Sequence, residues 1–217
     1  MEENRTKYQE TLRFSDTNPY ERRSIYRDIG FLKVSTLKKD VAKDLELIRE
    51  GIDITCIMLD KPHKIKEIIS HTNYSNNLVK QIPIELYSDF EENTQGWLAN
   101  SRADEVFYFF NDAVISANLS QMRYFVDKLY YEESLATKLQ EMVNTFIHNG
   151  VKGKTTNEKI GISLYVTENE NGHHTVGIKV DTDILPDYAM DVTEYYFEEE
   201  EPEEPQEEPD VENENVE

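Results

Sequence analysis

Apolar and polar residues alternate through much of the chain, and this alternation predicts short strands. Residues 81–87 show it most clearly, because Ile82, Ile84 and Leu86 share one face. Two further pairs of runs flank the turn sequences at 111–112 and 171–172, so each pair predicts a hairpin. The predicted strands cover residues 52–59, 63–69, 81–87, 105–110, 113–117, 162–166 and 175–180.

Apolar residues spaced three or four positions apart predict helices on both sides of these strands. Pro19 suits a first helical position, Gly51 can end a helix, and Asn118 can cap one. The predicted helices cover residues 19–29, residues 36–49, a segment that begins near Asn118, and a segment from Leu135 to Ile147. This order of elements predicts an α+β (mixed α/β) fold, in which helices flank a central mixed sheet.

Charge divides the chain into unequal parts. The 217 residues include 23 Lys and Arg against 44 Asp and Glu, which gives a net charge of −21. Residues 191–217 hold 14 of the acids and no base, so residues 1–190 carry only −7. Dense like charge with three prolines cannot build a core. We therefore expect a flexible N-terminus at 1–18, one domain at 19–190, and a disordered acidic interaction tail at 191–217.

Several classes of protein are excluded by simple features of the sequence. No run of about 18 apolar residues is present, so we expect no membrane span. The first residues lack the basic and apolar layout of a signal peptide, and Cys56 has no second cysteine to pair with. These features predict a cytoplasmic protein.

Two motifs that could carry chemistry are weak. Gly153-Lys154-Thr155 ends like a phosphate-binding loop, but the glycine required at 148 is a histidine. His173 and His174 are neighbours in a predicted strand, so their side chains should point to opposite faces and not share a metal. We expect no zinc site from the sequence.

One constellation of charged residues is stronger. Asp53 interrupts an apolar strand, which is costly unless a partner neutralises it. The next strand presents Lys64 and Lys66 on one face, and a third strand presents Glu85. Two carboxylates and a lysine can hold Mg²⁺ and a nucleophilic water beside a phosphate. The alternative is a structural ion pair between Asp53 and a lysine.

The same residues resemble nucleases of the PD-(D/E)xK superfamily. The resemblance rests on Gly51-Ile52-Asp53, a strand that ends in Lys66, and the segment from Gly96-Trp97-Leu98 to Ala103-Asp104. It implies a restriction-endonuclease-like domain, with Asp53 as metal ligand, Lys66 as catalytic lysine and Glu85 as a second metal ligand. Lys64 stands where the family has Glu or Gln, and a cation cannot bind Mg²⁺. We therefore expect no enzyme and no cofactor, or Mg²⁺ if the site is active.

The layout also resembles phage host-takeover proteins that carry an acidic C-terminal arm. This resemblance implies an inhibitor that binds a host nucleic-acid enzyme, with RNA polymerase of the host as the expected target, through an arm that mimics DNA. The expected partner-binding residues are Tyr195, Tyr196, Phe197, Glu198, Glu199, Glu200, Glu201, Glu203, Glu204, Glu207, Glu208 and Asp210. The aromatic residues at the root of the arm can equally pack on the domain.

Two other functions stay open at this stage. The first is an active Mg²⁺-dependent DNA endonuclease that uses Asp53, Lys66 and Glu85. The second is a DNA-binding domain without catalysis, in which the body contacts DNA through the bases of its first helices. Those bases are Arg22, Arg23, Arg27, Lys38, Lys39 and Lys43.

Overall fold

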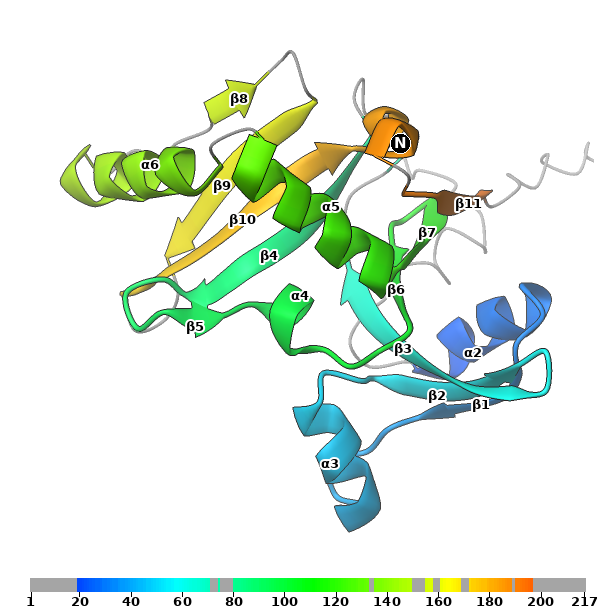
Figure 1. Cartoon of the computed structure of the whole chain (residues 1–217). Coiled ribbons are helices and arrows are strands. Elements are labelled where there is room, and N and C mark those ends of the chain that lie inside the picture. The colour runs from blue at the N-terminus through cyan, green and yellow to red at the C-terminus, as the bar shows by residue number, and fades with distance from the viewer. Residues whose placement is uncertain are drawn as a thin grey trace, which may run out of the picture.

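A computed structural model of the chain describes residues 19–70, 74, 80–132, 135–149, 155–157, 161–168, 172–188 and 190–196. Within these residues the chain forms a six-stranded sheet, sheet A, and a five-stranded sheet, sheet B, with helices around them (Figure 1). The α+β class expected from the sequence is confirmed. The strands are divided between two sheets instead of one central sheet.

Sheet A is mixed. Its strands, in order across the sheet, are β1 (Leu32–Thr36), β2 (Ile54–Met58), β3 (Lys61–Ile69), β6 (Glu105–Phe109), β7 (Ala113–Asn118) and β11 (Val192–Tyr196). Only β3 and β6 run parallel among the paired strands that the structure describes. A parallel pair needs a long crossover connection, and here that connection contains two strands of the other sheet.

Sheet B is antiparallel throughout its described strands. Its order is β5 (Thr94–Gln95), β4 (Gln81–Asp89), β10 (His174–Asp181), β9 (Ile162–Glu168) and β8 (Thr155–Asn157). The alternation noted in the sequence is borne out, because Ile82, Ile84 and Leu86 of β4 are all buried. The predicted hairpin of β9 and β10 is also present.

Four of the described helices correspond to predicted segments, whereas the helix at Trp97–Asn100 and the 3-10 helix have no predicted counterpart. The helices are α2 (Pro19–Asp28), α3 (Ala42–Arg49), α4 (Trp97–Asn100), α5 (Leu119–Glu132) and α6 (Leu135–Asn149), and a 3-10 helix covers Thr182–Tyr188. Asn118 caps α5 as expected, because its Oδ1 accepts hydrogen bonds from the backbone N–H groups of Ser120 and Gln121 at 3.0 and 3.1 Å. Gly51 follows α3 with a positive φ of 69°, which favours glycine.

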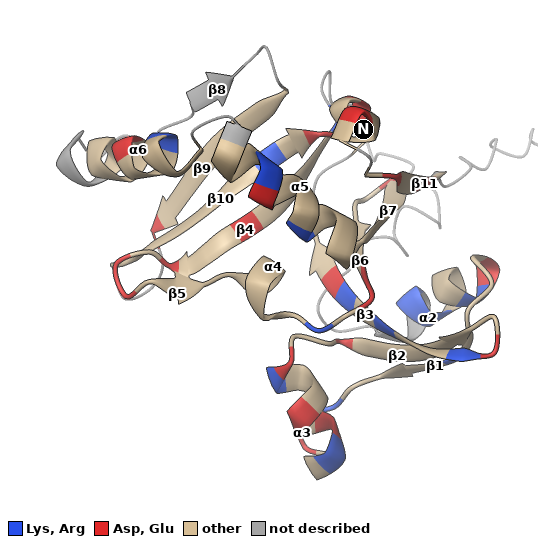
Figure 2. Cartoon of the chain, viewed as in Figure 1, with Lys and Arg blue, Asp and Glu red and all other residues tan. Residues whose placement is uncertain are grey.

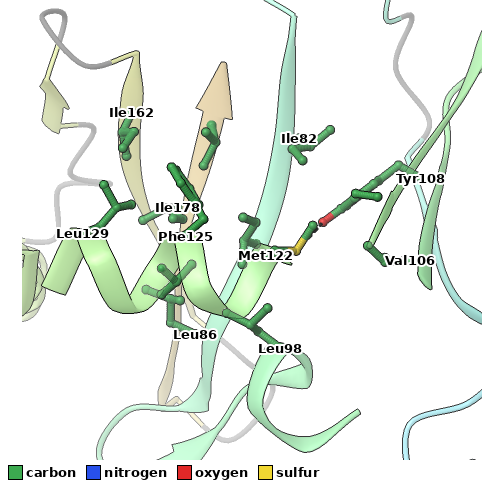
Figure 3. Close-up of a cluster of buried hydrophobic side chains, with 14 of the residues drawn as sticks. Ile82, Leu86, Leu98, Val106, Tyr108, Met122, Phe125, Leu129, Ile162 and Ile178 are labelled. Carbon is green, nitrogen blue, oxygen red and sulfur yellow. Dashed lines mark hydrogen bonds between the residues drawn. The ribbon is translucent and has the colours of Figure 1, made fainter. Parts of the chain in front are cut away.

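Two hydrophobic cores lie on opposite sides of sheet A. The larger core joins sheet A to sheet B and to α5 and α6, and Figure 3 shows Phe125 of α5 beside Ile178 of sheet B and Met122 of α5 pointing toward Tyr108 of sheet A. The smaller core lies between α2 and the other face of sheet A. Cys56 belongs to this smaller core, and burial raises the pKa of its thiol to about 12, so the side chain packs as a small apolar residue.

Two local differences separate the structure from the predicted elements. Residues 32–36 form the edge strand β1, so the helix predicted to begin at 36 starts at Ala42. Residues 192–196 form β11, so the segment expected to be a tail from 191 joins sheet A up to Tyr196. The N-terminus at 1–18 and the acidic residues from Phe197 onward lie outside the described residues.

No helix among the described residues has the length and apolar content needed to cross a bilayer.

Candidate functional site

Asp53 lies immediately before β2, and its carboxylate binds the neighbouring strand β3 twice. Its Oδ2 accepts a hydrogen bond from Lys66 Nζ at 2.9 Å and another from the backbone N–H of Glu67 at 2.9 Å. The first partner register between β2 and β3 is Ile54 with Ile65, so Glu67 lies beyond the paired residues. The structure thus brings Asp53 and Lys66 together. It also gives Asp53 a structural role, because its carboxylate accepts a hydrogen bond from the backbone N–H of Glu67.

Lys64 lies on the same face of β3 as Lys66 and pairs with a different acid. Its Nζ lies 4.0 Å from Glu50 Oε2, while Arg102 approaches the other oxygen of Glu50 at 3.9 Å. These contacts place two cations close to the carboxylates at this end of sheet A. The ammonium group of Lys64 repels a divalent metal ion, which is the effect predicted above for a lysine at this position.

Glu67 has the most buried charge among the residues near Asp53. Its side chain is only 7% exposed, and its Oε1 accepts a hydrogen bond from the Tyr26 hydroxyl at 2.9 Å. Arg22 Nε of α2 lies 3.3 Å from the same oxygen. Burial raises the pKa of the Glu67 carboxyl, and Arg22 and Tyr26 oppose that rise. This buried cluster holds α2 on sheet A.

Glu85 lies in β4 of sheet B, where its register partner is Gly177. Its Oε1 accepts a hydrogen bond from the backbone N–H of Trp97, the first residue of α4, at 3.2 Å. Gly96 permits this close approach, because a Cβ there would lie 2.5 Å from the Glu85 carbonyl oxygen. Within the described residues, Asp53 and Glu85 belong to no group of three or more metal-ligating atoms within 4.8 Å of one another.

The segment at 96–104, which carries the best part of the nuclease resemblance, works as a strap between the two sheets. The Ser101 hydroxyl donates to the Gly51 carbonyl at 2.8 Å, and Asp104 Oδ2 accepts a hydrogen bond from the Lys64 N–H at 2.8 Å. Arg123 of α5 donates to the carbonyls of Leu98 and Ser101. Ser101 and Asp104 of this strap therefore have hydrogen-bonding roles in the fold.

The root of the acidic segment is fixed on the domain. β11 pairs with β7 over five residues, from Val192 with Ala117 to Tyr196 with Ala113. Glu194 accepts a hydrogen bond from the Tyr74 hydroxyl at 2.8 Å and pairs with Lys80 at 3.3 Å. Of the aromatic residues expected at a partner surface, Tyr195 packs against the smaller core. Phe197 and the acids from Glu198 to Asp210 lie outside the described residues.

A second polar site was missed by the sequence reasoning. Asp89 at the end of β4 and Glu91 in the following turn meet His173, which precedes β10, and His174, its first residue. His173 Nδ1 lies 2.7 Å from Asp89 Oδ2, and His174 Nδ1 contacts Glu91 Oε1. The two neighbouring histidines therefore contact different acids, because His173 faces Asp89 and His174 faces Glu91. The acid-rich turn sequence Asp89-Phe90-Glu91-Glu92 was the available signal, and Figure 2 shows this turn in red.

Comparisons of the chain with models of protein families, with curated proteins and with solved structures gave no match.

Proposed function

We propose that this protein is an inhibitory binding protein whose acidic C-terminal segment occupies a basic, nucleic-acid-binding surface of another protein. The observation that carries the proposal is the junction at Tyr196. A strand held in sheet A leads directly into residues 197–217, which contain 12 acids and no base. An anchored polyanion of this kind competes with nucleic acid for a basic channel, because it repeats dense negative charge along one chain.

The mixed charge on the domain supports separate roles for the domain and the acidic segment in binding. Lys and Arg residues surround α2, α3 and the turn between β2 and β3, as Figure 2 shows in blue, and acids are interspersed among them. The domain can therefore dock on a partner by ordinary complementary contacts while the acidic segment supplies long-range attraction. The first partner to test is the RNA polymerase of a bacterial host, which is the target that the layout implies.

A truncation experiment tests the acidic segment directly. A chain that ends at Tyr196 keeps β11 and every contact of the domain described above, whereas a chain that ends at 190 loses the edge strand of sheet A. The matched control is the full-length chain with all 12 acids of residues 197–217 changed to Gln or Asn, which keeps the length and removes the charge.

We expect both variants to bind and inhibit RNA polymerase at least tenfold less than the full-length protein in a transcription assay. Inhibition by the full-length protein should also weaken as salt is raised from about 0.05 to 0.2 M, because screening shortens the range of charge attraction. Equal inhibition by the chain that ends at Tyr196 would contradict the proposal.

A second candidate function is a Mg²⁺-dependent DNA endonuclease, and the observation that favours it is the contact between Asp53 and Lys66. The 2.9 Å pair matches the metal-binding Asp and catalytic Lys that the resemblance implies. Plasmid cleavage with Mg²⁺ or Mn²⁺ that disappears in Asp53→Ala and in Lys66→Ala would establish this activity. Glu85, the second metal ligand that the resemblance implies, lies in sheet B and accepts a hydrogen bond from Trp97 of α4. We therefore expect that the plasmid is not cleaved.

A further inference from the structure

The end of sheet B where β4 turns into β5 brings together carboxylate and imidazole side chains that the proposed function does not use. Asp89 ends β4, Glu91 lies in the following turn, and His173 precedes β10, 84 positions from Asp89 along the chain. One ligand atom from each of the three residues lies within 4.8 Å of the other two. Imidazole nitrogen and carboxylate oxygen thus converge from two parts of the backbone that are far apart along the chain.

The two carboxylates are held in position by groups outside this triad. Asp89 Oδ1 accepts a hydrogen bond from the Glu92 N–H at 3.0 Å. Glu91 Oε2 accepts one from the His174 N–H at 2.8 Å, and the His174 ring contacts the other oxygen. The His174 ring is itself fixed edge-to-face against Phe146 of α6 at 4.8 Å. A ligand carboxylate oriented by a neighbouring hydrogen-bond partner is the usual surrounding of a protein metal site.

We propose that Asp89, Glu91 and His173 bind one zinc ion that ties the turn after β4 to the start of β10. Zinc takes imidazole and carboxylate ligands at about 2.0–2.2 Å, and tetrahedral ligands at that distance lie about 3.3–3.6 Å apart. The three ligand atoms lie within 4.8 Å of one another, so an ion would widen the 2.7 Å contact between His173 and Asp89 and draw Glu91 to ligand distance. Imidazole in the set favours zinc over Mg²⁺ and Ca²⁺, which prefer oxygen ligands.

His63 provides an internal contrast, because it is also flanked by two carboxylates. Its Nδ1 lies 3.8 Å from Asp104, while its Nε2 lies 3.4 Å from Glu105. The acids face different ring nitrogens, which lie on different sides of the imidazole, so they cannot meet at one ion. At His173 the single nitrogen Nδ1 faces Asp89. The direction of the imidazole, and not the number of nearby acids, distinguishes the two places.

The test is calorimetric titration of the full chain with ZnCl₂ in excess Mg²⁺, which saturates weak carboxylate sites in the acidic segment. Cobalt(II) is titrated in parallel, since its visible spectrum reports nitrogen ligation and coordination number. We expect one site per chain. In His173→Ala and in Asp89→Asn the affinity should fall at least tenfold, while His63→Ala should bind like the natural chain.

Circular dichroism melting checks that each variant is folded. If His173→Ala does not fold, the zinc affinity of Asp89→Asn tests the proposal by itself. Unchanged zinc affinity in both triad variants would overturn the proposal. So would binding that disappears in the chain ending at Tyr196, because the ion would then belong to the acidic segment.

Discussion

Two charged sites on one face of β3 differ in their exposure to water. Glu67 and His63 are four residues apart and alternate with the buried Ile65, so all three face the side of sheet A that α2 covers. Glu67 lies under α2 and is 7% exposed, whereas His63 lies near the strand start and is 17% exposed beside a 51% exposed Asp104. We therefore expect the ion pair of Glu67 with Arg22 under α2 to contribute more to the free energy of unfolding than the more exposed pairs of His63.

The largest effect is expected at the buried site. Arg22→Ala removes the cation that faces Glu67, so a buried carboxylate is left without its charge partner. Loss of one partner of a buried pair costs roughly 3–5 kcal/mol of unfolding free energy. Arg27→Ala is the matched control, because Arg27 is an exposed base of the same helix. Urea unfolding measures both variants, and a loss below about 1 kcal/mol in Arg22→Ala would break the comparison.

A smaller effect is expected from the hydroxyl that completes the same site. Tyr26→Phe removes the hydrogen bond to Glu67 Oε1 and leaves the ring packing against Phe107 and Phe109 unchanged. Hydrogen bonds to charged groups contribute about 1.5–3 kcal/mol. Tyr124→Phe, at a 58% exposed tyrosine of α5, should change the unfolding free energy by less than about 0.5 kcal/mol. Similar losses in the two variants would contradict the expected role of burial.

The smallest effect is expected at His63 and depends on pH. The Glu105 carboxylate raises the pKa of His63, although partial burial of the ring opposes the rise. Because the folded pKa is higher than the unfolded one, charged His63 stabilises the fold fully below about pH 6.5 and this contribution is lost as pH rises through the folded pKa.

The pKa of His63 is read from an NMR titration of its ring protons, and His63→Gln identifies the signal. The difference in unfolding free energy between the natural chain and His63→Gln should shrink as pH rises above neutrality. A pKa at or below the ordinary histidine value would show that desolvation, and not Glu105, dominates at this site.

The sequence predicted the elements whose signals are local. Strict alternation identified β4, and Asn118 and Gly51 marked the start of α5 and the end of α3. It missed β1 because Leu32–Thr36 is a short edge strand with a register shift and a residue, Lys33, at positive φ. Its exposed residues lack the apolar face that marks a buried strand.

The contact between Asp53 and Lys66 in the candidate site was predicted, whereas the place of Glu85 was not. Asp53 and Lys66 meet because they lie on the adjacent strands β2 and β3, or directly beside them, and the pairing of these strands sets the register. Glu85 was placed beside them on the assumption of one sheet, and it lies in the second sheet instead. The meeting of Asp89 with His173 depends on long-range pairing of β4 with β10, which no local pattern encodes.

The order in which the chain visits its two sheets has a consequence for synthesis on the ribosome. It builds three strands of sheet A, then β4 and β5 of sheet B, and then returns for β6 and β7. It completes sheet B with β8 to β10 before β11 closes sheet A. Sheet A lacks its edge strand β11 while residues 192–196 are still inside the exit tunnel, whereas every strand of sheet B precedes them in the chain. We therefore expect sheet B to gain protease resistance first and sheet A to gain it only after Tyr196 emerges.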